Sequence, residues 1–354
     1  MSTFTAYCAC EAHGQLMPKL FERRALRADD VAIEIAYCGV CHSDLHQVHN
    51  DWKNTVYPCV PGHEIVGHVA AVGPSVTMYK IGDRVAVGCL VDSCGQCDPC
   101  RAGEEQLCVK GPTATYNGKD RVTGETTLGG YADKIVVREK FVLRVPEALD
   151  LKYASPLLCA GITVWTPMRE HGVGPGTKLA VVGLGGLGHM GVKIAVALGA
   201  EVTVITTSPS KADDARALGA HQVLLSTDQK AMMASLNAFD FILDTIPRRH
   251  DVNPYLMLLG RNGVLAVVGA IDLLEPVHGG LLIRNNRRLA GSLIGGLPAT
   301  QELLDFCAEH QVLPQCELIA MDDINTAYTR VQANDVKYRF VIDMASMKHA
   351  QVVQ

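Results

Sequence analysis

A strand followed at once by a glycine-rich turn and a helix constrains this chain more than any other feature. Residues 178–182 read Lys-Leu-Ala-Val-Val, an apolar run typical of a buried parallel strand, and the next six residues read Gly-Leu-Gly-Gly-Leu-Gly. A helix is predicted from Gly186 to Leu198, with Gly199 at its C-terminal cap. Glycines at this spacing permit a tight turn and let the backbone approach a pyrophosphate at the helix N-terminus. The stretch therefore predicts a dinucleotide-binding unit.

The same alternation of strands and helices continues from about residue 156 to residue 296. Further strands are predicted at residues 201–205, 221–225, 239–244, 263–269 and 288–294. Six strands with intervening helices match a doubly wound parallel sheet of the Rossmann type, so this part of the chain is expected to be α/β. The turn residues expected to contact the cofactor are Gly183, Leu184, Gly185, Gly186, Leu187 and Gly188.

The end of the second predicted strand indicates which dinucleotide is bound. NAD sites place Asp or Glu there, about 20 residues after the glycines, to bind the ribose hydroxyls. This chain instead has hydroxyls and a lysine, namely Thr206, Thr207, Ser208 and Lys211. Such groups donate hydrogen bonds and positive charge to a 2′-phosphate, which a carboxylate would repel. We therefore expect NADP(H), although the serines could equally cap the following helix, and both roles are compatible.

The remainder of the chain has a different pattern. Short strand-like runs at residues 31–35, 68–72 and 84–88 are separated by turn-forming residues, as in a compact β-rich barrel. The tail from residue 297 contains a predicted helix at 299–309 and a strand at 336–342. That strand need not extend the Rossmann sheet and could return to the first domain. A length of 354 residues suits two domains.

Thirteen cysteines are unusually many, and four of them are clustered. Cys94, Cys97, Cys100 and Cys108 have the two-residue gaps and single longer gap of a tetrahedral four-cysteine zinc site. Such a site has no open coordination position, so its expected role is structural. A disulfide framework is less favoured, because the chain is long and its first residues lack a signal-peptide pattern. The isolated cysteines are expected to be buried apolar residues: Cys8, Cys10, Cys38, Cys59, Cys89, Cys307 and Cys316.

A second group of possible metal ligands lies between Gly39 and Glu64. This stretch contains a thiol, imidazoles, a hydroxyl and carboxylates, which suffice to hold a metal ion and leave a proton-transfer group beside it. We interpret it as part of a catalytic zinc site.

Bulk properties exclude other classes of partner. The net charge of −5 and the isoelectric point near 6.2 give no electrostatic reason to expect nucleic acid or an anionic membrane. The sequence has no apolar run long enough to span a bilayer. We expect a cytoplasmic protein that acts on a small molecule.

Together these segments resemble the zinc-dependent medium-chain alcohol dehydrogenases, and most closely the cinnamyl-alcohol-dehydrogenase-like, NADP-dependent aldehyde reductases. Residues 62–76, with Gly62-His63-Glu64 followed by Gly67, Gly73 and Val76, fit the zinc signature of that family. The segments 39–44 and 157–161 also match, and the resemblance covers essentially the whole length. It implies a GroES-like catalytic domain built from residues 1–155 and 297–354, with the cysteine lobe at about 94–108, and a Rossmann domain at 156–296. The active site is then expected in the cleft between them.

The resemblance also implies the zinc ligands. Alcohol dehydrogenases hold a catalytic zinc with two cysteines and one histidine, which correspond here to Cys41, Cys159 and His63. Glu64 matches a glutamate that can occupy the open position in a resting form. Asp44 matches the carboxylate that orients the histidine. With the cysteine lobe, two zinc ions per chain are expected.

The cofactor and proton-transfer residues follow from the same resemblance. Ser43 is expected to pass a proton to or from the substrate, through a relay that continues by way of the cofactor ribose to His46. Thr163 matches the position beside the nicotinamide, Arg339 is expected to reach the pyrophosphate, and Trp52 is a candidate for the substrate pocket. Further cofactor contacts are expected at Thr245, Gly269, Leu293, Ile294 and Gly295.

The expected function is reduction of aldehydes to primary alcohols, and the reverse, by a homodimer using zinc and NADP(H). One alternative is an NAD(P)-dependent polyol or secondary-alcohol dehydrogenase, but a cysteine at position 159 and the Thr-Thr-Ser loop count against it. Another is a non-catalytic NADPH-binding protein, which the complete ligand set argues against.

Overall fold

A computed structural model describes residues 2–269 and 273–349 of the 354-residue chain. The chain divides into two compact units. The first unit comprises residues 1–159 and 295–354, and the second comprises residues 160–294. These divisions lie within a few residues of the limits expected at 155 and 297. Each unit is described separately below.

The second unit contains a six-stranded sheet in the order β12-β11-β10-β13-β14-β15. Every neighbouring pair is parallel, so the predicted doubly wound sheet is confirmed. Strand order reverses between β10 and β13, the place where such sheets bind ligands. The strands are β10 (Lys178–Val182), β11 (Glu201–Thr206), β12 (Gln222–Leu225), β13 (Phe239–Asp244), β14 (Leu259–Val267) and β15 (Arg288–Gly291).

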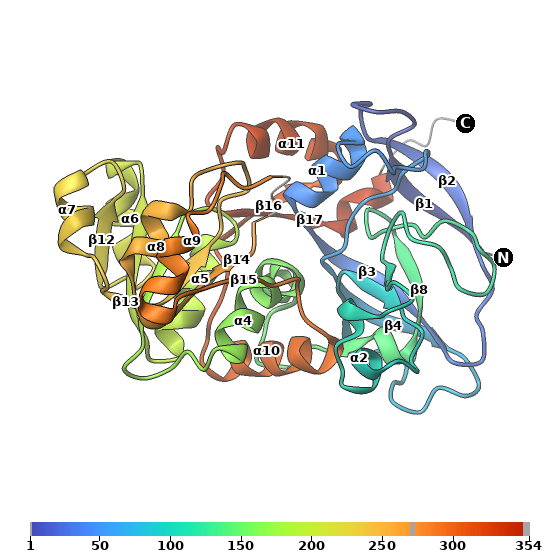
Figure 1. The fold of residues 1–354 in the computed structure, drawn as a ribbon. Helices are drawn as coiled ribbons and strands as arrows, with labels where there is room; N and C mark the ends of the chain where they lie inside the picture. The colour runs from blue at the N-terminus through green and yellow to red at the C-terminus, as the bar shows by residue number, and fades with distance from the viewer. Residues whose placement is uncertain (1, 270–272, 350–354) are drawn as a thin grey trace. The chain divides into compact units, whose positions relative to one another are not determined.

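Helices accompany this sheet because each crossover between parallel strands needs one (Figure 1). Helix α5 (Gly188–Ala197) packs against β10 and β11. It begins two residues later than expected from the sequence and is followed by Gly199, whose φ of 87° is the left-handed conformation that glycine favours. The others are α4 (Ala160–Glu170), η4 (Pro209–Lys211), α6 (Ala212–Ala217), α7 (Gln229–Ala234), α8 (Asn253–Leu258), α9 (Gly279–Ile283) and η5 (Arg284–Asn286).

The first unit is built on a seven-stranded sheet in the order β16-β17-β3-β4-β5-β9, with β8 paired to β3. Strand β17 from the C-terminal tail pairs antiparallel with β3, so the tail joins this unit. The strands are β3 (Asp30–Val40), β4 (Ile65–Val72), β5 (Arg84–Val87), β8 (Lys134–Arg138), β9 (Leu143–Arg144), β16 (Cys316–Ala320) and β17 (Arg339–Asp343). A separate hairpin consists of β1 (Ser2–Cys8) and β2 (Met17–Arg23).

The first unit also contains a second short strand pair and several helical elements. The cysteine lobe lies between β6 (Leu90–Asp92) and β7 (Thr113–Ala114), which pair with each other. The helical elements are α1 (His42–His49), α2 (Asp98–Arg101), η1 (Glu105–Leu107), η2 (Glu139–Phe141), α3 (Leu151–Ala154), η3 (Ser155–Leu158), α10 (Leu297–Glu309), η6 (Met321–Asp323), α11 (Ile324–Gln332) and η7 (Met344–His349).

Within the described ranges, none of the helices has both the length and the apolar character needed to cross a membrane.

Candidate metal and cofactor sites

Four buried side chains of the first unit gather their possible ligand atoms within 4.8 Å of one another: Cys41, His63, Glu64 and Cys159. The antiparallel pairing of β3 with β4 brings the first three together, because Cys41 follows β3 and the other two precede β4. Cys159 arrives from the end of η3, which packs against both strands. The structure thus brings together the ligands that the resemblance implied.

The spacing of the two sulfurs fits a shared zinc ion. Cys41 Sγ and Cys159 Sγ lie 3.8 Å apart. Two sulfurs bound tetrahedrally at about 2.3 Å from one zinc would be separated by about 3.8 Å, whereas a disulfide has an S–S length of about 2 Å. A hydrogen bond from the Cys159 thiol, aided by the charge of Arg339, holds the pKa of Cys41 well below its usual value despite burial. This favours the thiolate form that metal binding requires.

Asp44 positions the ligands of this cluster through hydrogen bonds. Its carboxylate is fully buried, and it accepts hydrogen bonds from the backbone N–H groups of Cys41 at 2.9 Å and Gly62 at 3.1 Å. It also contacts His63 Nδ1 at 3.0 Å and accepts a bond from the Tyr131 hydroxyl at 3.3 Å. Because Nδ1 is engaged by Asp44, Nε2 of the same ring is left for a metal. The expected orienting role of Asp44 agrees with this geometry.

Glu64 is buried beside the cluster and faces Arg339. Its Oε1 lies 3.3 Å from Arg339 Nη2, but neither carboxylate oxygen accepts a hydrogen bond from the described residues. Burial, only partly offset by Arg339, raises the pKa of Glu64 to about 8. A Cβ on Gly39 would lie 2.0 Å from Glu64 Oε2, so only glycine leaves room for this carboxylate. Buried polar atoms normally have a hydrogen-bond partner. The two unpartnered oxygens of Glu64 are therefore available to bind a metal ion.

Arg339, which the resemblance assigns to the pyrophosphate, lies beside the metal ligands of the first unit. Its guanidinium is buried in the first unit, donates to the backbone oxygen of Val40 at 3.1 Å and faces Glu64. Although burial acts to lower it, the neighbouring carboxylate raises the pKa of Arg339, which stays charged. The antiparallel pairing of β17 with β3 brings position 339 beside the metal ligands.

The expected proton-transfer residues lie on helix α1. Cys41 caps this helix, and the backbone N–H of Ser43 faces the Cys41 sulfur at 3.5 Å. His46 is one turn further along, with Nδ1 2.8 Å from Asp51 Oδ2. Its ring centroid lies 5.6 Å from that of Trp52, whose side chain is 46% exposed. Ser43 and His46 thus share a helix that starts at a metal ligand.

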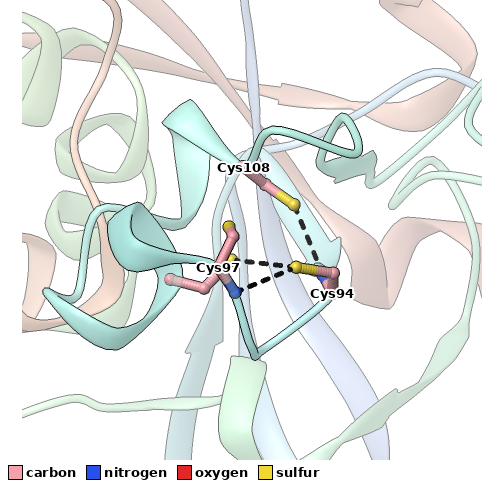
Figure 2. A group of neighbouring side chains, drawn as sticks. Cys94, Cys97 and Cys108 are labelled. Carbon is pink, nitrogen blue, oxygen red and sulfur yellow. Dashed lines mark hydrogen bonds between the residues drawn. The ribbon is translucent and has the colours of Figure 1, made fainter.

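The second cluster is the cysteine lobe, Cys94, Cys97, Cys100 and Cys108, whose sulfurs also lie within 4.8 Å of one another. Figure 2 shows three of these side chains converging on one point. Cys94 Sγ and Cys100 Sγ are 3.9 Å apart, close to the spacing of about 3.8 Å that tetrahedral zinc imposes. The residues therefore fit a four-thiolate zinc site.

Backbone N–H groups donate hydrogen bonds to two of the sulfurs in this lobe. The N–H of Cys97 donates to Cys94 Sγ at 3.4 Å, and the N–H of Cys94 donates to Cys108 Sγ at 3.4 Å. Backbone donors lower the pKa of Cys94 to about 6, whereas burial raises that of Cys100 to about 11. The lobe is tied to α10 by Glu105, whose carboxylate accepts the backbone N–H of Leu297 at 3.1 Å.

The glycine-rich turn between β10 and α5 has the form predicted from the sequence. Gly183 has a φ of 90°, in the left-handed region. A Cβ on Gly188 would lie 2.1 Å from the Gly183 carbonyl oxygen, so close packing of turn and helix requires glycine. A Cβ on Gly185 would meet nothing within 4 Å. This middle glycine therefore leaves open space where a pyrophosphate can approach the backbone.

The end of β11 presents the polar set expected to bind a 2′-phosphate. Thr206 Oγ1 accepts the backbone N–H of Ser208 at 3.2 Å, and Thr207 follows with an exposed side chain. Lys211 reaches back to the glycine-rich turn, where its Nζ donates to the Leu184 carbonyl at 3.0 Å. The nearest following carboxylate, Asp213, pairs with Arg216 instead. Positive charge and hydroxyls are thus gathered beside the turn.

Other expected cofactor residues are spread through both units. Thr163 is buried within α4, and Thr245 directly follows β13. Gly269 follows β14, and a Cβ there would lie 2.2 Å from the Ile246 carbonyl oxygen, so this position needs glycine for close packing. Leu293, Ile294 and Gly295 follow β15; the Leu293 side chain is 60% exposed, and the division between units falls after Ile294.

The interpretation of the isolated cysteines needs correction. Cys10 is exposed, and Cys89 and Cys316 are half-buried. Cys89 also borders the buried metal-ligand cluster, because its thiol donates to the Leu158 carbonyl at 3.7 Å and forms a hydrogen bond with Cys159. Sequence reasoning missed Cys89 and the Glu64–Arg339 pair, since no spacing pattern links positions so far apart.

Comparison with known proteins agrees with the fold and these sites. Residues 27–147 match the family described as "Alcohol dehydrogenase GroES-like domain", and residues 186–309 match the family described as "Zinc-binding dehydrogenase". The first match covers three of the four residues of the buried metal cluster, and the second begins at Gly186 and covers strands β11 to β15 of the parallel sheet. With relatives about half identical over nearly its whole length, the chain belongs to the zinc-dependent alcohol dehydrogenase family.

Several relatives within that family are named for their activity. The chain is 50% identical over 349 residues to NADP-dependent alcohol dehydrogenase C 1 of Mycolicibacterium smegmatis, covering 98% of this chain and 100% of that protein. It is 51% identical over 338 residues to the aldehyde reductase YahK of Escherichia coli, covering 95% and 96% respectively. Its fold matches a cinnamyl alcohol dehydrogenase of Sorghum bicolor with a TM-score of 0.95, 45% identity and complete coverage of both chains.

Proposed function

We propose that this enzyme reduces aldehydes to primary alcohols, and catalyses the reverse oxidation, by hydride transfer with NADP(H) at a zinc site. The observation that carries the proposal is the buried cluster of Cys41, His63, Glu64 and Cys159. Two thiolates and an imidazole are ligands that zinc prefers, and a three-residue ligand set leaves a position for substrate. When bound, zinc supplies a Lewis acid for the substrate oxygen, and NADP(H) supplies or accepts the hydride.

The residues around the cluster prepare it for this chemistry. Asp44 holds the His63 ring through Nδ1 and holds the helix that carries Cys41, so two ligands depend on one carboxylate. Glu64 and Arg339 form a buried pair beside them, which keeps a positive charge within reach of the thiolates. The Arg339 charge favours the deprotonated thiol of Cys41 that the site needs.

Reduction of an aldehyde also requires a proton, which we assign to helix α1. The Ser43 hydroxyl is two residues from Cys41 and donates a proton to the product oxygen. His46, half-buried and bonded to Asp51, exchanges a proton with solvent. Trp52 lies against the His46 ring and borders the substrate.

The preference for NADP(H) is assigned to the end of β11. Thr206, Thr207 and Ser208 offer hydroxyls, and Lys211 supplies a positive charge that already contacts the glycine-rich turn. Such a group recognises a 2′-phosphate. The NADP-dependent activity named for the Mycolicibacterium relative agrees with this assignment.

The alternatives explain less of the structure. A polyol or secondary-alcohol dehydrogenase of the same fold is disfavoured because the third ligand position holds a cysteine and because the chain resembles enzymes named for aldehyde and cinnamyl-alcohol activity. A non-catalytic NADPH-binding protein would have no use for a buried, charge-balanced ligand set beside a free hydroxyl.

Assembly and location complete the proposal. We assign two zinc ions per chain, the second in the cysteine lobe, because both clusters have sulfur spacings that suit zinc. A homodimer is proposed because β15 is the last strand of its sheet among the described residues and Leu293 is exposed just beyond it. All thirteen cysteines are free thiols, as in the reducing cytoplasm.

Steady-state assays with NADPH across aromatic, aliphatic and polyol-derived carbonyl substrates test the function. The wild-type protein should reduce aldehydes, and Cys159→Ala should abolish turnover together with one bound zinc. Cys307→Ala is the matched control, because it removes another buried thiol from α10, outside both clusters. Aldehyde reduction that survives in Cys159→Ala would refute the assigned zinc site, and absence of NADPH-linked turnover in wild type would refute the function.

A further inference from the structure

The glycine-rich turn is supported by Thr245, the residue that directly follows the neighbouring strand β13. Strands β10 and β13 are adjacent, and Val182 and Asp244 are register partners at their ends. The turn continues from one strand and Thr245 follows the other. The Thr245 hydroxyl donates to the Val182 carbonyl at 2.8 Å and contacts the Gly183 carbonyl at 3.4 Å. Strand order reverses here, which is the binding crevice of such sheets.

Thr245 also fills the space that two glycines leave. A Cβ on Gly183 would lie 3.0 Å from Thr245 Oγ1, and a Cβ on Gly188 would lie 3.3 Å from the same atom. The hydroxyl therefore sits against the first and third glycines of the fingerprint while satisfying carbonyls at its start. Thr245 is 7% exposed, so it supports the turn from within the unit.

The position of Thr245 depends in turn on its neighbour Asp244. Asp244 is fully buried, with a solvent exposure of 0%. Its Oδ1 accepts the backbone N–H of Ile246 at 3.1 Å, and its Oδ2 lies 2.7 Å from His250 Nε2. These two contacts tie the residues on either side of Thr245 to each other and to His250.

His250 completes the loop with its other ring nitrogen. Nδ1 lies 2.8 Å from the Arg248 carbonyl oxygen, so each ring nitrogen of His250 faces an oxygen atom. The ring thus joins the carboxylate to the backbone of its own segment. Gly269 contributes from the other side, since only glycine permits the close approach of the Ile246 carbonyl.

We propose that His250, through Asp244, is a positioning residue that holds Thr245 against the glycine-rich turn and keeps the turn in the shape that binds the NADP(H) pyrophosphate. The inference rests on the proposed cofactor role of that turn. The hydrogen-bond contacts of the His250 ring are with Asp244 and the Arg248 carbonyl, so it acts on the turn through the segment 244–246. Loss of the ring should therefore loosen cofactor binding and leave the chemical step of the loaded enzyme unchanged.

Equilibrium binding of NADPH, followed by fluorescence titration, tests this assignment. His250→Ala should raise the Kd for NADPH about tenfold, a typical size for coupling between a support and a site. His250→Gln retains an N–H donor toward Asp244 and should recover much of the affinity. His221→Gln is the matched control, because that ring accepts the Val202 N–H at 3.0 Å in the same unit and precedes β12, at the other end of the strands.

Two further measurements separate positioning from general stability. At saturating NADPH, kcat of His250→Ala should stay within about twofold of wild type while the KM for NADPH rises, because cofactor binding is weakened equally in the ground state and the transition state. Amide hydrogen exchange of the zinc-loaded protein without cofactor should accelerate over residues 182–190 in His250→Ala and remain unchanged in His221→Gln.

The opposing results are equally specific. A Kd in His250→Ala within twofold of wild type, or no rescue by His250→Gln, would overturn the assignment. If His250→Ala does not fold, His250→Phe keeps a ring in this space and removes both ring nitrogens; an unchanged Kd there would also overturn the assignment. Wild type that fails to bind NADPH would instead refute the proposed function.

Discussion

Removing the carboxylate of Asp44 provides the sharpest test of how the first unit holds its metal ligands. In Asp44→Ala, the N–H groups of Cys41 and Gly62 and the His63 ring lose their common acceptor. A buried donor left without a partner costs about 1–3 kcal/mol. Water entering the vacated space recovers part of this, so we expect a loss of about 3 kcal/mol in the free energy of unfolding.

The same substitution should weaken zinc binding. Loss of a group that orients a histidine ligand costs about 10- to 100-fold in metal affinity. Zinc content and competition with a chromogenic chelator measure this affinity, and urea unfolding of the zinc-loaded protein measures the stability. Both should change together, because one carboxylate serves the helix cap and the ligand.

Tyr131→Phe is the matched control. It removes only the hydroxyl that donates to Asp44 at 3.3 Å and leaves the other three contacts in place. Its cost should be about 1.5 kcal/mol, the lower end of the range for a hydrogen bond to a charged acceptor, with little change in zinc affinity. If Asp44→Ala loses no more stability than Tyr131→Phe and retains its zinc, the carboxylate does not organise the site and our reasoning is wrong.

Three further predictions follow from the other clusters. Lys211→Glu should raise the KM for NADPH by at least about tenfold with little change for NADH, because a carboxylate repels a 2′-phosphate; equal effects on both cofactors in steady-state assays would contradict this. Cys97→Ser should reduce bound zinc from two ions to one per chain and lower the unfolding midpoint by about 5 °C, while aldehyde turnover of the folded enzyme persists. In zinc-free protein, burial raises the pKa of Glu64 from 4.5 to about 8, so folding favours its protonated form. Its contribution to stability should be complete below pH 4.5 and be lost as the pH rises toward about 8, whereas Glu64→Gln should flatten that slope in urea unfolding curves; an unchanged slope would remove Glu64 as its cause.

Features that lie within a short stretch of chain were predictable from the sequence. The strand, glycine turn and helix at 178–197 form as expected, because periodicity and glycine spacing act between near neighbours. The cysteine lobe falls in the same class, since its four sulfurs lie within fifteen residues. The hydroxyls and lysine after β11 were likewise visible as a local departure from the carboxylate of NAD sites.

What the sequence left open concerns partners that are remote along the chain. Cys41 and Cys159 are 118 residues apart, and Arg339 reaches the Val40 carbonyl across 299 residues. Local spacing carries no signal for such pairs, and only the resemblance supplied Cys159. The register of β17 on β3 decided that Glu64 and Arg339 meet, because it brings the guanidinium beside the carboxylate.

The sequence by itself thus determined which chemical groups are available and which local elements carry them. Only the tertiary structure decided which groups meet. The strand pairings of the first unit bring the buried Asp44 carboxylate to two metal ligands, Cys41 and His63. The adjacency of β10 and β13 places Thr245 against the glycine turn. The physical reason is that propensities depend on neighbours within a few residues, whereas ligand geometry depends on strand register and on the burial of charged groups against one another.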